Sequence, residues 1–301
     1  MYKRTKIGAD IGSYYAKSSE GKKFENRISI DDSILSGGAT KVEFNGQKYL
    51  IENGVFDINV NKTIKDNLLV SIATLIGLST SDTCIDLGIG LPVNYYKLQK
   101  TALQNLIKQN EEMSVVINGD SKRFYINKCV VIPEAVGVYY SLDAEFLKAI
   151  NKREVLIVDI GGKTTDTCII DSNMTIKNPS TQTIGMLNLY NNVSNLINAN
   201  YPELCVKVED VRDILDNGLS SFDRSIDLGF IDILFEKMVK SIFNFIKLQY
   251  EDYQRKIVIL CGGGFTLADR FKNYIPNIIV NNDIYANAKG FKKYLELVGD
   301  E

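Results

Sequence analysis

The sequence VLIVDIGGKTTD, residues 155–166, decides the fold because the chain uses its design twice. An apolar strand runs into Asp-Ile-Gly, and polar residues then begin a second strand. Residues 6–12, with the sequence KIGADIG, open the chain in the same way. Internal repeats indicate architecture before any other detail does. Two such turns, about half a chain apart, predict two similar halves that face a single charged ligand.

The two turns carry groups that suit a phosphate. Asp10 and Asp159 end buried strands, and ligands gather at the carboxyl ends of strands in open α/β folds. Gly12, Gly161 and Gly162 have no side chain, so backbone amides there can approach a phosphate closely. A carboxylate beside a phosphate needs a hard cation between them, so we expect Asp10 and Asp159 to hold Mg²⁺, largely through waters. The alternative is that the glycines only make tight turns and the aspartates only cap loops, but the matched pair favours a ligand.

Further polar side chains accompany the two turns. Lys17 and Lys163 would neutralise phosphate charge, and Ser13 and Thr164 would donate hydroxyl hydrogen bonds. Thr165 adds another hydroxyl. With the glycines, these residues make up the predicted phosphate-binding set.

Glu134 is the candidate for activating a water molecule. It follows Pro133 at the start of a helix that we expect to run to about residue 150. A carboxylate there is also stabilised by the helix dipole alone, so a purely structural role is the alternative. The chain has no histidine, so a carboxylate is the natural group to orient a water toward the terminal phosphate of a nucleotide.

Two features of the second half suggest a place for a nucleoside. The run Gly262, Gly263 and Gly264 follows an apolar strand and leaves room for a flat ring against the backbone. Glu209 and Arg212 lie one helical turn apart and would frame a purine and its ribose. The alternatives are a simple strand-to-helix turn for the glycines and a solvated helix face for the charged pair.

Composition excludes several classes of protein. The chain has 301 residues, enough for two domains, and a net charge of −2, which gives no basic field to recruit nucleic acid or membrane directly. The lack of histidine excludes Ser-His-Asp triads, Cys-His dyads and histidine-ligated zinc. The five cysteines have no C-x-x-C spacing, which is typical of buried thiols in a reducing cytosol. With no signal peptide and no bilayer-length apolar run, we expect a soluble cytoplasmic protein.

Periodicity supplies the expected elements. Strands alternate with helices in both halves, which favours an α/β protein with mixed sheets. A hairpin is predicted at Asn45-Gly46, a strong two-residue turn signal. Helices are expected over residues 62–78 and, as the longest, about 227–255. Lys152-Arg153 marks a polar break and a plausible boundary between the halves.

Five motifs in order resemble the actin/Hsp70/sugar-kinase ATPase superfamily. They are a first phosphate loop at 10–12, a first connecting helix at 132–137, a second phosphate loop at 159–166, an adenosine motif at 260–264 and a second connecting helix at 287–290. Gly185, within residues 183–186, is similar to a further phosphate-contacting turn of these proteins. Size and loop pattern resemble the bacterial actin-like proteins, closest to the plasmid-segregating ParM type.

The resemblance implies two actin-like (RNase H-like) domains with mixed five-stranded sheets, flanking helices and a nucleotide cleft between them. Domain I would hold residues 1–150 and 271–301, and domain II residues 151–270. ATP or GTP with Mg²⁺ would bind in the cleft, with Glu134 and Asp159 as the catalytic residues and Asp10 and Asp159 as the metal ligands.

The function implied is a nucleotide hydrolase that forms head-to-tail filaments and drives plasmid DNA segregation. It would contact DNA only indirectly, through a ParR-like adaptor bound to a centromere-like site, and would not use a membrane. The alternatives are a small-molecule kinase of the same superfamily, acting on a sugar or a carboxylate, and a non-polymerising regulatory ATPase.

Overall fold

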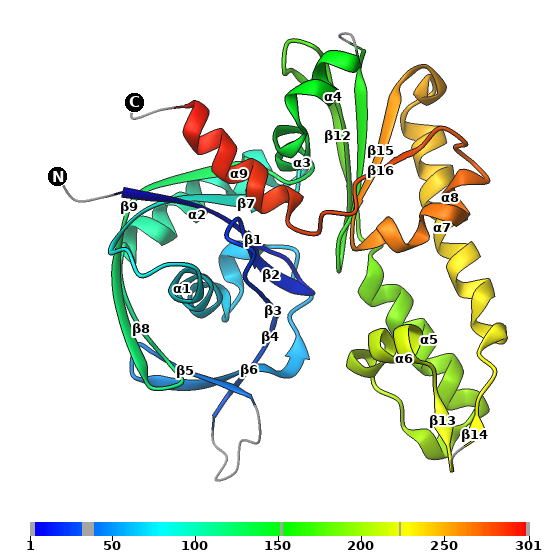
Figure 1. The fold of residues 1–301 in the computed structure, drawn as a ribbon, viewed down its shortest axis with the longest axis horizontal. Helices are drawn as coiled ribbons and strands as arrows, with labels where there is room; N and C mark the ends of the chain where they lie inside the picture. The colour runs from blue at the N-terminus through cyan, green and yellow to red at the C-terminus, as the bar shows by residue number, and fades with distance from the viewer. Residues whose placement is uncertain (1–3, 32–38, 151–152, 223, 299–301) are drawn as a thin grey trace.

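The protein consists of two α/β units that lie side by side (Figure 1). The computed structural model describes residues 4–31, 39–150, 153–222 and 224–298. The predicted fold class, an α/β protein with two mixed sheets and flanking helices, is confirmed. Lys152 of the predicted break between the halves lies outside the described residues. No helix in the described part of the chain is long and apolar enough to cross a membrane.

A single continuous sheet forms the first unit. Its strands are β1 (Arg4–Ile11), β2 (Tyr15–Ser18), β3 (Lys23–Glu25), β4 (Arg27–Ile30), β5 (Thr40–Phe44), β6 (Gln47–Phe56), β7 (Cys84–Leu91), β8 (Glu112–Ile117) and β9 (Asp120–Pro133). Their order is β3-β2-β1-β7-β9-β8-β5-β6-β4, nine strands rather than the expected five. The reason is the length of β9, which pairs with β7 through residues 125–133 and with β8 through residues 120–125. The hairpin of β5 and β6 turns at Asn45-Gly46 as predicted, with both residues at positive φ.

Five strands form the second sheet. They are β10 (Val155–Ile160), β11 (Thr165–Ile170), β12 (Ile176–Gln182), β15 (Ile257–Gly262) and β16 (Ile279–Val280), in the order β12-β11-β10-β15-β16. The strands β13 (Ser220–Ser221) and β14 (Arg224–Ser225) form a separate hairpin. β10 is parallel to β15 and antiparallel to β11, which repeats the relation of β1 to β7 and β2 in the first unit. The two halves therefore share one plan, as the repeated turn predicts.

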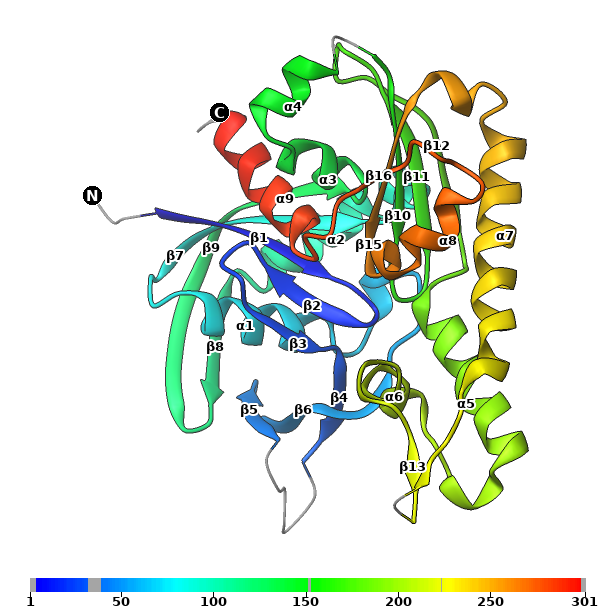
Figure 2. The same cartoon turned by 45° about the vertical axis from the view of Figure 1, so that its right-hand side comes forward.

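The helices flank these sheets. They are α1 (Leu68–Ser79), α2 (Tyr96–Gln109), α3 (Val136–Ser141), α4 (Ala144–Ala149), α5 (Met186–Asn200), α6 (Val211–Asn217), α7 (Asp232–Gln249), α8 (Ala268–Lys272) and α9 (Ala286–Leu297). Short 3-10 turns include η1 (Lys62–Ile64), η4 (Gly229–Ile231) and η5 (Tyr253–Arg255). Figure 2 shows α5 and α7 along one side of the second unit. The longest helix, α7, is shorter than the helix expected over residues 227–255, because the 3-10 turns η4 and η5 occupy the two ends of that range.

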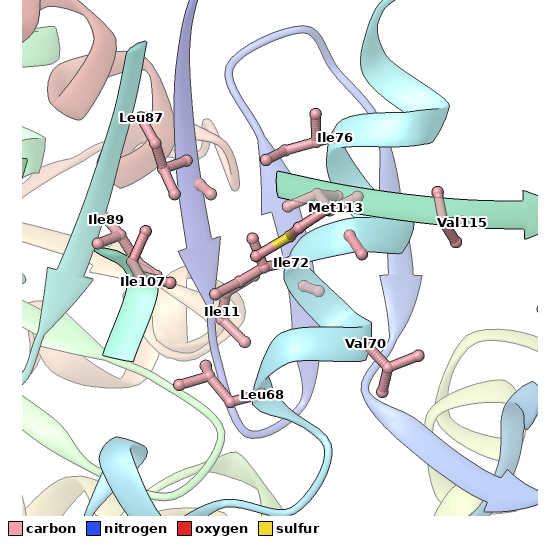
Figure 3. Packing of buried hydrophobic residues seen from close by; sticks show 14 of the residues in the cluster. Ile11, Leu68, Val70, Ile72, Ile76, Leu87, Ile89, Ile107, Met113 and Val115 are labelled. Atoms are coloured by element: carbon pink, nitrogen blue, oxygen red, sulfur yellow. The ribbon is translucent and has the colours of Figure 1, made fainter. Parts of the chain in front are cut away.

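The first sheet curves around α1, which is apolar on nearly every side. Ile72, Leu75 and Ile76 are completely buried. Figure 3 shows the helix side chains among those of β1, β7 and β8, including Ile11 and Met113. A helix that is hydrophobic all round belongs inside a core. This core fixes the strand ends that carry the first acidic turn.

The helix expected over residues 62–78 is interrupted. The side chain of Asn61 accepts a hydrogen bond from the backbone of Thr63 and closes the single turn of η1, and Lys65 then takes an extended backbone. α1 begins only at Leu68. The interruption lets both Lys62 and Lys65 bury their side chains instead of lying on a solvated helix face.

The helix expected from Pro133 to about residue 150 is also divided. β9 continues through Pro133, α3 begins at Val136, and α3 and α4 are separated because Asp143 caps the backbone of Phe146. Ala135, between strand and helix, has φ of 66° and ψ of −41°, a strained conformation for a residue other than glycine. This tight junction sets the position of Glu134.

The C-terminal helix α9 crosses back to the first unit and packs on β1, β7 and α3. A Cβ placed on Gly290 would lie 1.7 Å from the carbonyl oxygen of Gly137, so the two helices meet backbone to backbone. β16 still pairs with β15 in the second sheet. The structure therefore places the return to the first unit after residue 280, later than the boundary expected at residue 271.

Candidate functional site

The two acidic turns have the same backbone geometry. The amide of Gly12 donates to the carbonyl of Tyr15 at 3.0 Å, and the amide of Gly161 donates to the carbonyl of Thr164 at 2.8 Å. Each turn joins a buried central strand to its antiparallel neighbour. The repeat seen in the sequence is thus a repeat of structure.

A cleft between the two units brings most of the predicted site residues together. Its lining includes thirteen of them: Asp10, Gly12, Ser13, Lys17, Glu134, Asp159, Gly161, Gly162, Lys163, Thr164, Arg212, Gly262 and Gly263. The two acidic turns lie on facing sides, because a Cβ on Gly162 would lie 2.8 Å from the backbone nitrogen of Tyr14. The cleft is therefore narrow at the turns and bounded by both units.

Four predicted residues do not line this cleft. Thr165 is completely buried, and its hydroxyl donates to the carbonyl of Ile184 at 2.6 Å. Gly185 lies behind the second turn, where the following amides of Met186 and Leu187 donate to the carbonyls of Gly161 and Gly162. Gly264 packs on Ile160, whose side chain would be 2.4 Å from an added Cβ. Glu209 lies in a separate groove, with its carboxylate 4.0 Å from the guanidinium of Arg27. Gly185 and Gly264 thus support the site rather than face it.

The two aspartates of the turns, Asp10 and Asp159, are both buried, and the charge of Asp10 affects the pKa of Asp159. Asp10 forms a 2.7 Å ion pair with Lys17, and Asp159 accepts a 2.6 Å hydrogen bond from the amide of Asn287. Burial raises the pKa of Asp159 to about 6, and the negative charge of Asp10 adds to the rise. Burial alone would lower the pKa of Lys17, but the hydrogen-bonded carboxylate of Asp10, together with the charges of Asp159 and Glu134, raises that pKa. Each carboxylate has an oxygen already held, so its direction is fixed in advance.

Glu134 is held by a lysine that the sequence did not single out. The ammonium of Lys62 lies 2.5 Å from one carboxylate oxygen of Glu134 and donates to the carbonyl of Gly90 at 3.0 Å. Lys62 is 4% exposed, so its charge needs such a partner. In the sequence Lys62 is only the first residue of the helix expected over residues 62–78, and no local pattern marks it, because only the break after η1 turns it inward.

A second buried lysine, Lys65, also lines the cleft. Its ammonium donates to the carbonyl of Asp57 at 2.9 Å and to the hydroxyl of Ser13 at 3.4 Å. Burial lowers its pKa to about 8. The first turn therefore has a second cation beside it.

Asp166 connects the second turn to the first unit. Its carboxylate accepts from the backbone amide of Val93 at 2.9 Å, the hydroxyl of Thr164 at 2.9 Å and the hydroxyl of Thr181 at 2.6 Å. Burial raises its pKa to about 7, and the charge of Glu134 adds to the rise. A single buried carboxyl thus ties a cleft hydroxyl to the backbone of the opposite unit.

The acidic pair fits a magnesium ion. The described residues contain no cluster of three or more histidine, cysteine, aspartate or glutamate side chains that would form a protein-only metal cage. Mg²⁺ does not need one, because it is usually bound by one or two carboxylates together with phosphates and waters. Asp10 and Asp159, buried at facing strand ends and lining one cleft, provide that donor set.

Comparisons with known proteins agree with this architecture. Two family models match: actin-like proteins, N-terminal domain, over residues 8–137, and archaeal actin homologue MreB-like, C-terminal, over residues 157–273. No curated protein matches the chain significantly.

Solved structures match over nearly the whole chain. The archaeal actin homologue Ta0583 has a TM-score of 0.83 and 19% identity, with 97% of this chain and 99% of that chain covered. A 15-stranded ParM filament from Clostridium botulinum has a TM-score of 0.79 and 20% identity, covering 98% and 99%. The structure of Ta0583 in complex with ADP has a TM-score of 0.80 and 18% identity, with 97% of this chain and 99% of that chain covered. The chain belongs to the actin-like superfamily, and its resemblance to the ParM type fits these findings.

Proposed function

We propose that this protein is an actin-like nucleotide hydrolase that assembles head to tail into filaments in the cytoplasm and moves plasmid DNA apart. The observation that carries the proposal is the cleft in which the two acidic turns face each other with Glu134 beside them. The likeness to a ParM filament supports the assembly, and the ADP complex of Ta0583 supports a nucleotide as the ligand.

The phosphates of ATP or GTP would bind between the two turns. Backbone amides at the turn glycines would donate to phosphate oxygens, and Lys17 and Lys163 would balance their charge. Asp10 and Asp159 would hold Mg²⁺, which when bound supplies positive charge against the phosphates. Asp159 would bind the ion as the carboxylate, so metal binding would favour its ionised form.

Glu134 would orient the attacking water toward the terminal phosphate. One of its oxygens is occupied by Lys62, and no hydrogen bond to the other is seen among the described residues. A carboxylate fixed in this way would hold a water molecule in one orientation. Positioning of this kind, together with electrostatic stabilisation, is how a protein catalyses phosphoryl transfer.

The nucleoside would extend toward the second unit. A pocket adjoining the cleft shares Met186, Tyr190 and Arg212 with it and continues to Asp216 and Arg270. The backbone of Gly262 and Gly263 forms the neighbouring wall of the cleft. Because this pocket has both acidic and basic side chains, both ATP and GTP should be tested as substrates.

Contact with DNA would be indirect. The net charge of −2 gives no field that favours nucleic acid, so a ParR-like adaptor bound to a centromere-like site would connect filament and plasmid. Nucleotide in the cleft contacts both units, so hydrolysis would change their relative closure and with it the stability of the filament.

A scattering and pelleting titration tests this function. The purified protein should be titrated with Mg-ATP, Mg-GTP or no nucleotide, with phosphate release recorded in parallel. We expect scattering to rise above a threshold protein concentration and to decay as nucleotide is consumed. Hydrolysis without assembly under any nucleotide would overturn the filament and favour a metabolite kinase or a monomeric switch.

A further inference from the structure

The hairpin of β13 and β14 presents an unusual exposed aromatic. Phe222 lies at its tip with 93% of its surface exposed and φ of 48°. Positive φ is rare and unfavourable for a bulky residue. Neither the exposure nor the conformation helps the unit to fold, so the ring is positioned for contact with something else.

A pocket at the other end of the same unit has the complementary character. It is lined around the beginning of β15 by apolar groups that include Tyr253, Tyr274, Pro276 and Ile279. Ile279 is 38% exposed. We call this the basal pocket. It lies at the amino ends of strands whose carboxyl ends carry the nucleotide cleft.

The hairpin and the basal pocket are separated by the length of α7. The hairpin precedes this 18-residue helix and η5, which lines the pocket, follows it. At 1.5 Å per residue the helix spans about 27 Å. Figures 1 and 2 both show β13 and β14 below one end of α7, with β15 beginning near the other. The ring cannot reach the pocket of its own molecule.

We propose that Phe222 inserts into the basal pocket of a second copy of this chain and is the anchor of the longitudinal filament contact. Two different surfaces at opposite ends of one unit make a heterologous contact, which repeats without closing and generates a filament. Aromatic side chains are enriched in such interfaces and bury about 150–250 Å² each. The inference rests on the proposed function, because it gives the assembly its contact residues.

The charges beside the two surfaces agree with this pairing. Asp213 and Asp227 flank the hairpin in the chain and are exposed. Their carboxylates accept hydrogen bonds from the side chain of Asn217 and the amide of Gly229, and neither forms an ion pair within the described residues. Arg153, exposed at the basal pocket, likewise has no carboxylate partner in the part of the chain that is described. Lys256 in the same pocket is already neutralised by Glu154 and Asp252. Arg224, exposed on β14, is the cation of the hairpin itself, so these named groups leave the hairpin end with a net negative charge. The basal end carries the guanidinium of Arg153, and this difference in charge favours head-to-tail over head-to-head contact.

Single variants test the two surfaces separately. Phe222→Ala removes the ring and Ile279→Asp places a charge in the pocket. Each should raise the threshold concentration for nucleotide-dependent assembly at least tenfold, while nucleotide binding stays within twofold of the unmodified protein. Phe222→Tyr keeps an aromatic, and Leu98→Ala removes another exposed apolar side chain, 79% exposed, from the first unit. Both controls should assemble within twofold of the normal threshold.

Mixing the two variants tests the direction of the contact. The Phe222→Ala chain keeps its pocket and the Ile279→Asp chain keeps its hairpin, so the mixture has one intact contact. Sedimentation velocity at tenfold the normal threshold should show a 1:1 dimer in the mixture and monomers in either variant alone. If the mixture gives no dimer, or if Phe222→Ala assembles at the normal threshold, the assignment of Phe222 as the anchor is wrong, but the proposal that the protein forms filaments is unaffected. Failure of the unmodified protein to assemble would remove both proposals.

Discussion

Glu134 and Lys62, which are 72 positions apart in the chain, form a partly buried ion pair. The pair explains how a carboxylate next to a strained alanine keeps one orientation inside a cleft. Sequence alone identified Glu134, from its place after a buried strand in a chain without histidine. It missed Lys62, because the burial of a lysine depends on where a neighbouring helix breaks.

Removing the charge of Glu134 should slow hydrolysis without abolishing binding. A positioned acid or base contributes about 10²–10⁴-fold, so Glu134→Gln should reduce single-turnover phosphate release by at least 10²-fold. Nucleotide affinity, measured by fluorescence titration, should change by less than fivefold. Unchanged hydrolysis would exclude Glu134 from the reaction.

Lys62→Met should act through Glu134 rather than on the nucleotide directly. It leaves the carboxylate unpaired and should also slow phosphate release. Combined with Glu134→Gln it should add little, because both changes remove the same oriented group. Effects that multiply in the double variant would show that Lys62 has an independent role.

At the scale of elements, the closest contact is the crossing of α3 and α9. Gly290 lies inside a helix, where alanine would ordinarily be favoured by about 0.5–1 kcal/mol. Here an added Cβ would lie 1.7 Å from the carbonyl oxygen of Gly137, which is backbone and cannot rotate away. The steric cost therefore exceeds the gain in helix propensity.

Gly290→Ala should lower the free energy of unfolding by about 1–3 kcal/mol or more. Urea denaturation followed by far-UV circular dichroism measures it. Gly229→Ala is the matched control, because the nearest neighbour of its Cβ would be a side-chain atom, a carboxylate oxygen of Asp227 at 3.3 Å, and not a backbone atom. A Gly290→Ala protein as stable as the control would mean that the helices separate freely at this crossing.

The secondary structure was predictable where a pattern is local and was missed where it depends on side-chain burial. The repeated turns, the Asn45-Gly46 hairpin and the buried strands follow from residues adjacent in the chain. The interruption of helix 62–78 and the division at Asp143 do not, because helical periodicity continues across both positions.

At the scale of the whole molecule, Asp166 links the two units through the amide of Val93. Its pKa is raised from an ordinary 3.8 to about 7, so the folded protein binds a proton that the unfolded chain has released. Stability from this group is complete below about pH 4 and is lost as the pH rises to about 7. Asp159, with a pKa of about 6, acts in the same direction.

The nucleotide-free protein should therefore become less stable to urea between pH 5 and pH 7, and change little above that. One group contributes at most about 1.4 kcal/mol per pH unit. Asp166→Asn stays neutral at every pH and should show a shallower dependence, with Asp159 responsible for what remains. An identical slope in the variant would mean that Asp166 is ionised throughout this range.

The sequence by itself determined the two-fold repeat, the α/β class, the superfamily and most residues of the cleft, because the acidic turns are encoded in contiguous residues. Only the tertiary structure placed Lys62, Lys65 and Asp166 at the site, extended the first sheet to nine strands, and set Phe222 and the basal pocket at opposite ends of one unit. These features depend on burial and on the relative placement of distant segments, which hydrophobic periodicity along a chain does not record.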